Sequence, residues 1–250
     1  MAIWWQNLTY AARRLRLSPG LALAAMLSIG LGVAANSTIF SMVNTFVLRP
    51  APVGDPSSLL SLNTLPRGER CCNQFTWPQY LDVRDKARSF SGVAAYYELL
   101  PASIGGSDEP ERVWGQAATG NYFDVIQRPM ALGRGFLPSE EQGQVIVLGY
   151  SLWQRRFAAD PAIVGRTVSL SGHRFTVIGV APRGFRGVDQ LLNPQFWVPL
   201  GNLEQPGASI PDRSSRVIYW LSVTARLQPG VSRAQAESEL RTLAANLSTA

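Results

Sequence analysis

The sequence LSPGLALAAMLSIGLGVAANSTIFSMVNTFVL, residues 17–48, contains no charged side chain, and a cluster of arginines that ends at Arg16 stands directly before it. A helix needs about 20 apolar residues to cross the hydrocarbon core of a bilayer, and this run exceeds that length. Lys and Arg flank the cytoplasmic end of a membrane-spanning helix. The sequence therefore predicts one transmembrane helix over residues 19–48, with residues 1–18 in the cytoplasm and the rest of the chain outside.

A cleaved signal peptide is the main alternative to a retained anchor. The small residues Val33, Ala34 and Ala35 would suit a cleavage site, which would release an exported enzyme that begins near Asn36. The apolar core of a signal peptide spans only about 7–15 residues, however, and this run continues beyond Ala35. A buried core helix is usually shorter than this run and rarely so free of charge. The retained anchor is therefore favoured, and the signal peptide stays open.

Small side chains recur along the predicted membrane helix. Ala24, Ser28 and Gly32 are spaced four residues apart and share one face of a helix. Small residues at this spacing let the backbone of a second helix approach closely, so we predict that this row packs against a partner helix. Residues 1–18 have amphipathic helical spacing with Trp and Arg, which favour the membrane interface and anionic headgroups. We predict that this segment lies on membrane lipid.

The charge of the chain reflects membrane orientation rather than nucleic-acid binding. Of the 23 basic residues, four flank the apolar run, and all 17 acidic residues follow it. The exported part is therefore close to neutral and lacks the clustered Lys and Arg of a nucleic-acid footprint. The two cysteines, Cys71 and Cys72, are neighbours and cannot form an ordinary disulfide; two free thiols are favoured over a strained vicinal disulfide. The exported fold therefore depends on its apolar core.

The sequence offers little for catalysis. The single histidine, His173, lies beside a predicted hairpin turn, and the adjacent cysteines lack the spacing of metal ligands. No G-x-S-x-G motif occurs, and the only lysine, Lys86, follows Asp85, which excludes a G-x-x-x-x-G-K-[ST] nucleotide loop. The carboxylates of Glu140 and Glu141 are expected to be solvated. We therefore predict no catalytic, cofactor-binding or metal-binding residue, and no enzyme.

Segments of β type and α type alternate after residue 52, which predicts an α+β fold. Capping boxes at Thr76 and Ser232 open two helices, and the turn at Gly172 joins two alternating runs as a hairpin. The expected strands lie at residues 59–64, 93–99, 113–118, 144–148, 167–170, 175–180, 196–200 and 217–226. The expected helices lie at residues 76–88, 122–126, 151–158 and 232–247.

The same pattern predicts two parts in the exported region. Residues 59–99 form a strand–helix–strand unit, and residues 217–247 add a strand and a helix to the same sheet. The first part is therefore assigned residues 49–109 and 206–250, with the β-rich residues 110–205 inserted into it. The last helix has an apolar stripe that is expected to cover the sheet.

Three stretches resemble a known family, in addition to the membrane run. They read TGNYFDVI at 119–126, ALGRGF at 131–136 and VIVLGYSLWQRRFAADPAIVGRTVSLSGHRFTVIGVAPRGF at 145–185. Together with residues 13–52 they are similar to the MacB-like periplasmic core domain of FtsX-type ABC transporter permeases, most of all to acidobacterial-type permeases without a fused ATPase. The resemblance covers nearly the whole chain.

The resemblance marks residues that build the fold. Trp153 and Phe157 are four apart and pack one helix face into a core, and Asp160, which precedes a proline, ends that helix. Gly165 and Gly172 supply turn conformations that are closed to β-branched residues. The marked set is Gly120, Tyr122, Phe123, Trp153, Phe157, Asp160, Pro161, Gly165, Gly172, Gly179, Pro182 and Phe185.

The resemblance also implies a function. It implies a single-pass protein of the bacterial inner membrane, with a cytoplasmic N-terminus and a periplasmic domain made of a porter-like βαβ subdomain and a β-rich inserted subdomain. Such a permease part couples a separate cytoplasmic ABC ATPase to periplasmic conformational change, in efflux or lipoprotein export. It pairs with a second permease subunit or half as a dimer and leaves a place for a periplasmic adaptor, and it binds no nucleic acid.

Two departures from the family pattern affect these expectations. The chain has Gln127 and Arg128 before Pro129, where the family often has Leu-Gly, so a tight turn is expected to change. A family permease has further spanning helices after its periplasmic domain, and one span cannot line a pathway, so we expect the sequence to be either a fragment of a permease or a truncated gene product. The alternative is a single-span periplasmic binding or regulatory module without transport activity.

Overall fold

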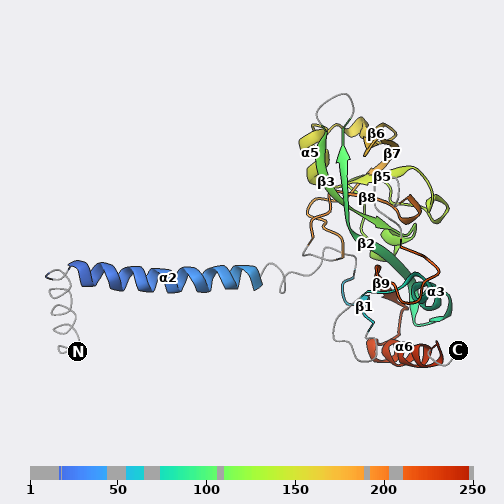
Figure 1. Cartoon of the computed structure of the whole chain (residues 1–250), viewed down its shortest axis with the longest axis horizontal. Coiled ribbons are helices and arrows are strands. Elements are labelled where there is room, and N and C mark those ends of the chain that lie inside the picture. Colours follow the sequence, from blue (N-terminus) through green and yellow to red (C-terminus); the bar gives the residue numbers. More distant parts are fainter. Residues whose placement is uncertain are drawn as a thin grey trace. The chain divides into compact units, whose positions relative to one another are not determined.

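The computed structural model describes residue 17 and residues 19–43, 55–64, 74–105, 110–188, 192–202 and 211–247 (Figure 1). The chain forms two compact units, Met1–Pro50 and Ala51–Ala250, and each is described by itself. The predicted cytoplasmic segment 1–18, apart from Leu17, and the two cysteines lie outside the described residues.

The first unit contains the helix α2, Pro19–Val43. Within it, Ala22–Ser41 is long and apolar enough to cross a membrane. The hydroxyl of Thr38 donates a hydrogen bond to the carbonyl of Ala34, at 2.8 Å, so this polar group is satisfied within the helix itself. The predicted span of 19–48 begins at the first residue of α2, and its last five residues lie outside the described part.

In its described residues, the second unit is built on one sheet of nine strands, which gives the α+β fold that the sequence predicts. The order of the strands is β1-β9-β2-β3-β8-β5-β7-β4, and β6 pairs with β2 and β7. The strands are β1 (Leu59–Leu62), β2 (Phe90–Ile104), β3 (Glu111–Ala118), β4 (Leu132–Gly133), β5 (Val145–Leu148), β6 (Thr167–Leu170), β7 (His173–Val180), β8 (Phe196–Pro199) and β9 (Ser222–Leu227). The helices are α3 (Trp77–Lys86), α4 (Tyr122–Ile126), α5 (Tyr150–Arg156) and α6 (Arg233–Leu247), with 3-10 turns η2 (Pro138–Glu140), η3 (Pro161–Ile163) and η4 (Leu200–Asn202).

Strand β9 lies between β1 and β2 and is antiparallel to both, with Ala225 opposite Leu60 on one side and Val93 on the other. The prediction that residues 59–99 and 217–247 share a sheet is therefore confirmed. Because β2 also pairs with β3 and β6, the sheet continues from these strands into the middle of the chain. The division at 49–109, 206–250 and 110–205 stays a prediction.

The sequence predicted the starts of two helices from their capping boxes. At α3, the hydroxyl of Thr76 accepts from the backbone N–H of Gln79, and the Gln79 side chain accepts from the N–H of Thr76. Ser232 and Gln235 make the same reciprocal pair ahead of α6. Both capping boxes are confirmed, and each satisfies backbone donors that a helix start leaves unpaired.

The predicted strand at 217–226 begins too early. Strand β9 begins only at Ser222, and Val217 is 80% exposed. The backbone groups of Trp220 and Leu221 instead pair with Phe75, whose N–H donates to the carbonyl of Leu221 at 2.7 Å. Residues 217–221 therefore do not extend β9, and two of them pair with Phe75, which lies far away in the sequence. The local sequence pattern does not indicate this pairing.

The buried core has two clusters. The larger one is mainly aliphatic and receives the half-buried Leu240 and Leu243 of α6, the helix that lies at the β1 and β9 end of the unit in Figure 1. The smaller one is aromatic, and in it the ring of Phe123 lies 5.2 Å from Phe136 and 6.0 Å from Trp197, between ring centroids. Such edge-to-face pairs add about 0.5–1.5 kcal/mol each beyond the area they bury.

Candidate functional site

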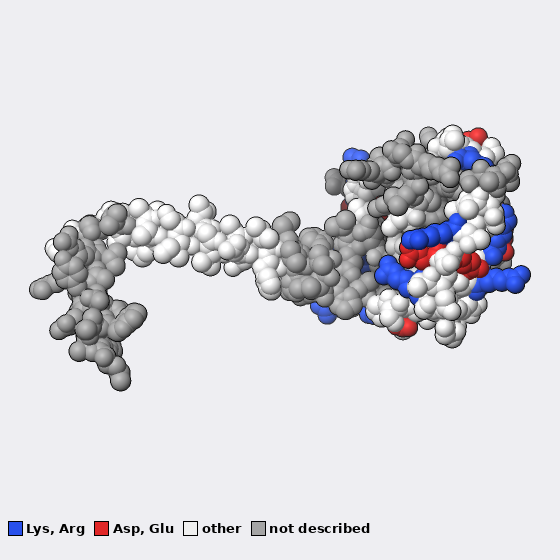
Figure 2. All heavy atoms as spheres, turned by 90° about the horizontal axis from the view of Figure 1, so that it is seen from below, with Lys and Arg blue, Asp and Glu red and all other residues white. Residues whose placement is uncertain are grey.

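Polar side chains in the second unit mostly bind other parts of the chain. Among the described residues, no group of three or more His, Cys, Asp or Glu side chains could hold a metal ion. His173 is exposed at the hairpin turn. Figure 2 shows basic side chains on either side of acidic ones on the face seen from below. Two buried charged side chains bind residues of other helices, strands or turns.

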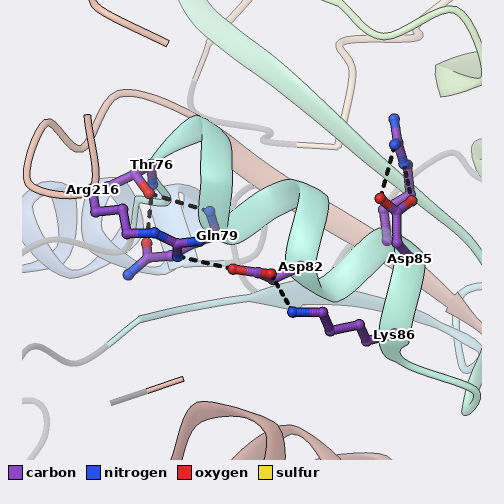
Figure 3. Close-up of polar contacts among 7 residues, drawn as sticks. Thr76, Gln79, Asp82, Asp85, Lys86 and Arg216 are labelled. Atoms are coloured by element: carbon purple, nitrogen blue, oxygen red, sulfur yellow. Dashed lines mark hydrogen bonds and ion pairs between the residues drawn. The ribbon is translucent and has the colours of Figure 1, made fainter. Parts of the chain in front are cut away.

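One such charge is Asp82 on α3 (Figure 3). Its side chain is 10% exposed, and its two oxygens accept from Lys86 Nζ at 2.6 Å and from Arg216 Nη1 at 2.9 Å. Burial raises the pKa of Asp82, but the hydrogen bonds from Lys86 and Arg216 outweigh it and hold this pKa below its ordinary value. Asp82 thereby fastens the segment before β9 to α3.

A second buried charge is Arg226 on β9, which is 4% exposed. Its Nε donates to the carbonyl of Val125 at 2.6 Å, and Nη2 donates to the carbonyl of Ile126 at 3.0 Å. Its Nη1 donates to Ser58 Oγ at 2.6 Å and to the carbonyl of Asp55 at 3.2 Å. Burial lowers the pKa of Arg226, which the carboxylate of Asp55 opposes, and a guanidinium stays protonated under both influences.

The expectation that Glu140 and Glu141 are solvated is wrong. Glu140 forms a two-point pair with Arg134, both bonds at 2.7 Å. Glu141 Oε2 accepts from the N–H of Gly120 at 2.7 Å, while Oε1 is buried and has no hydrogen-bond partner among the described residues. Burial raises the pKa of Glu141, and the N–H of Gly120 and two nearby arginines oppose this rise. The turn at η2 folds both carboxylates back onto the protein, and the sequence spacing does not reveal it.

The row Ala24, Ser28 and Gly32 is exposed along α2. A side chain added at Gly32 would meet nothing within 4 Å, so that face is open to another helix. The packing of this row against a partner stays a prediction.

The structure places five of the family-marked residues in three settings. The rings of Tyr122, Phe123 and Phe185 lie in the aromatic cluster. A Cβ at Gly120 would lie 2.8 Å from the carbonyl oxygen of Leu137, so this backbone approaches closely. Pro182 accepts from the N–H of Phe185 at 3.0 Å and opens the turn after β7.

The other marked residues surround the end of α5 and the following hairpin. Trp153 Nε1 donates to the carbonyl of Asp160 at 2.9 Å, and the half-buried Phe157 packs against the larger core. Asp160 Oδ1 accepts from the N–H of Ala162 at 2.9 Å, which caps η3 at Pro161. Gly165 and Gly172 have φ angles of 90° and 86°, and Gly179 lies against the backbone of Arg134.

Sequence reasoning missed Asp82, Arg226 and the burial of Glu141. The one available signal was Arg226, a charge in an otherwise uncharged strand, SVTARL. A charged side chain that is buried in a strand needs hydrogen-bond or ionic partners. The sequence therefore indicates that Arg226 has such partners if it is buried, but it does not identify them.

The sequence model of the MacB-like periplasmic core domain matches residues 22–243. No curated protein sequence matches the chain. The periplasmic region of MacB from Actinobacillus actinomycetemcomitans superposes with a TM-score of 0.58 at 18% identity, covering 78% of this chain and 86% of that chain. The extracellular domain of the noncanonic ABC-type transporter YknZ from Gram-positive bacteria superposes with a TM-score of 0.53 at 16% identity, covering 76% of this chain and 95% of that chain.

Proposed function

The chain belongs to the MacB-like periplasmic core domain family, and from this membership we propose that it is the membrane-anchored periplasmic part of an ABC transporter permease coupled to a separate cytoplasmic ATPase. The observation that carries the proposal is the extent of the family match, which begins inside α2 and runs through the sheet into α6. The chain has no nucleotide loop, so a partner would hydrolyse ATP.

The proposed orientation places the N-terminus in the cytoplasm and the second unit in the periplasm. It is supported by the arginines before the apolar run, since Lys and Arg remain on the cytoplasmic side. In this arrangement residues 1–18 would lie on the membrane face where an ATPase works. The row Ala24, Ser28 and Gly32 would contact a second permease subunit or half, because small residues allow close helix packing. Export of a lipoprotein and efflux of a small apolar compound both fit this arrangement. A periplasmic adaptor would bind the second unit.

The topology suggests how motion would reach the periplasm. Strand β1 follows the first described turn after α2, and it pairs with β9. Strand β9 in turn pairs with β2, which crosses the unit. A displacement of the turn before β1 would therefore act on the central strands directly, since hydrogen-bonded strands move together.

Two measurements test the proposal. The full natural gene product, tagged at its N-terminus, is expressed in its host, and protease is added to spheroplasts; the proposal expects the second unit to be cut and the tag to be protected. Solubilised complexes are then purified and probed for a nucleotide-binding protein. Release of a soluble unit that begins near Asn36 would show a signal peptide and end the proposal. An anchored protein that never copurifies an ATPase would instead support the single-span binding or regulatory module.

A further inference from the structure

We infer that Arg226 is a positioning residue that couples the turn at residues 55–58 to the C-terminal end of α4. The turn at 55–58 is the first described part of the second unit after α2, and α4 follows the family motif TGNYFDVI. The purpose of this coupling rests on the proposed function, but its geometry does not.

On one side, Arg226 closes the end of a helix. The last carbonyl groups of a helix have no partner within it and carry the negative end of the helix dipole. Arg226 donates to two of them, those of Val125 and Ile126. A buried cation therefore satisfies buried acceptors, and these hydrogen bonds offset part of the desolvation penalty of both groups.

On the other side, Arg226 holds the turn that precedes β1. Its Nη1 reaches both Ser58 Oγ and the carbonyl of Asp55. The turn has its own local bonds, because the Asp55 carboxylate accepts from the N–H of Ser57 at 3.2 Å and from its hydroxyl at 2.6 Å. Arg226 therefore binds a turn that is already shaped, and fixes its position relative to β9.

The planar guanidinium explains why one side chain serves both sides. Its donors point in fixed directions from three nitrogens, and here Nε and Nη2 face α4 while Nη1 faces the turn. Lysine presents all its donors from one atom, so it can bind either α4 or the turn but not both in this geometry. A shift of the turn that carries Ser58 therefore pulls on the group that caps α4.

Coupling makes a prediction that simple packing does not. Ser58→Ala removes an acceptor on the turn and touches nothing in α4. If Arg226 couples the two, its Nη1 loses the Ser58 acceptor and keeps that of the Asp55 carbonyl, so the guanidinium reorients and the cap of α4 weakens. Ser57→Ala is the matched control, because the Ser57 hydroxyl binds the Asp55 carboxylate and not Arg226.

The experiment is hydrogen–deuterium exchange of the full chain in lipid nanodiscs, followed by mass spectrometry. In Ser58→Ala, we expect exchange at residues 122–127 to accelerate roughly three- to tenfold, the change that the loss of one ordinary hydrogen bond would cause. In Arg226→Lys, exchange should rise both at 55–62 and at 122–127. Ser57→Ala should leave residues 122–127 unchanged.

Two results would overturn the coupling. One is faster exchange at 55–62 alone in Ser58→Ala; the other is an equal effect of Ser57→Ala on α4. If Arg226→Lys does not fold, the two serine variants still decide the matter. The assay needs no ATPase and no substrate, so a positive result without any associated ATPase would support the coupling and count only against the proposed transport role.

Discussion

At the scale of single residues, Gln127 has a φ of 55° at the C-cap of α4, a left-handed conformation that glycine favours. The turn before Pro129, which the sequence analysis expects to differ from the family, therefore contains a residue in an unfavourable backbone conformation. Gln127→Gly should raise the free energy of unfolding by about 0.5–1 kcal/mol, less than the full left-handed penalty because glycine also loses more chain entropy. Denaturant unfolding of the full chain in detergent measures this change. Gln127→Ala, which keeps the penalty, should leave stability almost unaltered, and a loss of stability in the glycine variant would contradict the argument.

Asp82 gives a prediction with a pH dependence. Asp82→Asn removes a carboxylate that binds both Lys86 and Arg216, and should lower the free energy of unfolding by about 1–2 kcal/mol at pH 7. The pKa of Asp82 is lower in the folded protein than its ordinary value of 3.8, so this stabilisation is present above that value and is lost as pH falls through the folded pKa.

Denaturant unfolding of both proteins between pH 3 and pH 8, values chosen to span the ordinary carboxyl range, tests the Asp82 prediction. The difference between wild type and Asp82→Asn should be constant near neutrality and shrink toward the acid end. The control is Asp85→Asn on the same helix, since the Asp85–Arg84 pair is exposed and contributes little. A difference that does not change with pH would show that the carboxylate charge is not responsible.

At the scale of elements, β4 and β7 approach too closely for a side chain at Gly179. The distance from an added Cβ to the carbonyl oxygen of Arg134 would be shorter than van der Waals contact allows. Gly179→Ala should therefore lower the free energy of unfolding by about 2–3 kcal/mol through overpacking.

At Gly165 an added Cβ meets no atom within 4 Å, and only the φ of 90° opposes it. Gly165→Ala should consequently cost about 1 kcal/mol. Thermal or denaturant unfolding of both variants compares them, and equal losses would refute the close approach.

The elements that the sequence predicted best have their information in adjacent residues. The hairpin of β6 and β7 follows from alternation around Gly172, and α3 follows from the capping box at Thr76. The start of β9 and the length of β2 were predicted less well. Strand β2 continues through a bulge between Tyr97 and Leu100 to Ile104, because β3 and β6 supply partners there. Those partners lie elsewhere in the chain, so the local pattern underestimates the strand.

At the scale of the whole molecule, the exposed small-residue row of α2 predicts an assembly. Ser28→Leu or Gly32→Leu should weaken dimerisation about tenfold, the loss that about 1.4 kcal/mol of helix packing would produce. Single-molecule photobleaching of the labelled protein in nanodiscs measures the dimer fraction. Ile29→Leu, which changes a different face and keeps the volume, is the control. An unchanged dimer fraction in both leucine variants would exclude this face of α2 as the contact.

The sequence by itself determined the apolar helix, the α+β alternation, the helix starts, the hairpin and the family. Each of these depends on the spacing of residues that are near one another along the chain. Only the tertiary structure decided that β9 lies between β1 and β2, that Glu141 is buried, and that Arg226 binds Val125, which is 101 positions away. The physical reason is that a strand or a buried charge is satisfied by whichever partner the completed fold brings to it, and that partner leaves no mark on the neighbouring sequence.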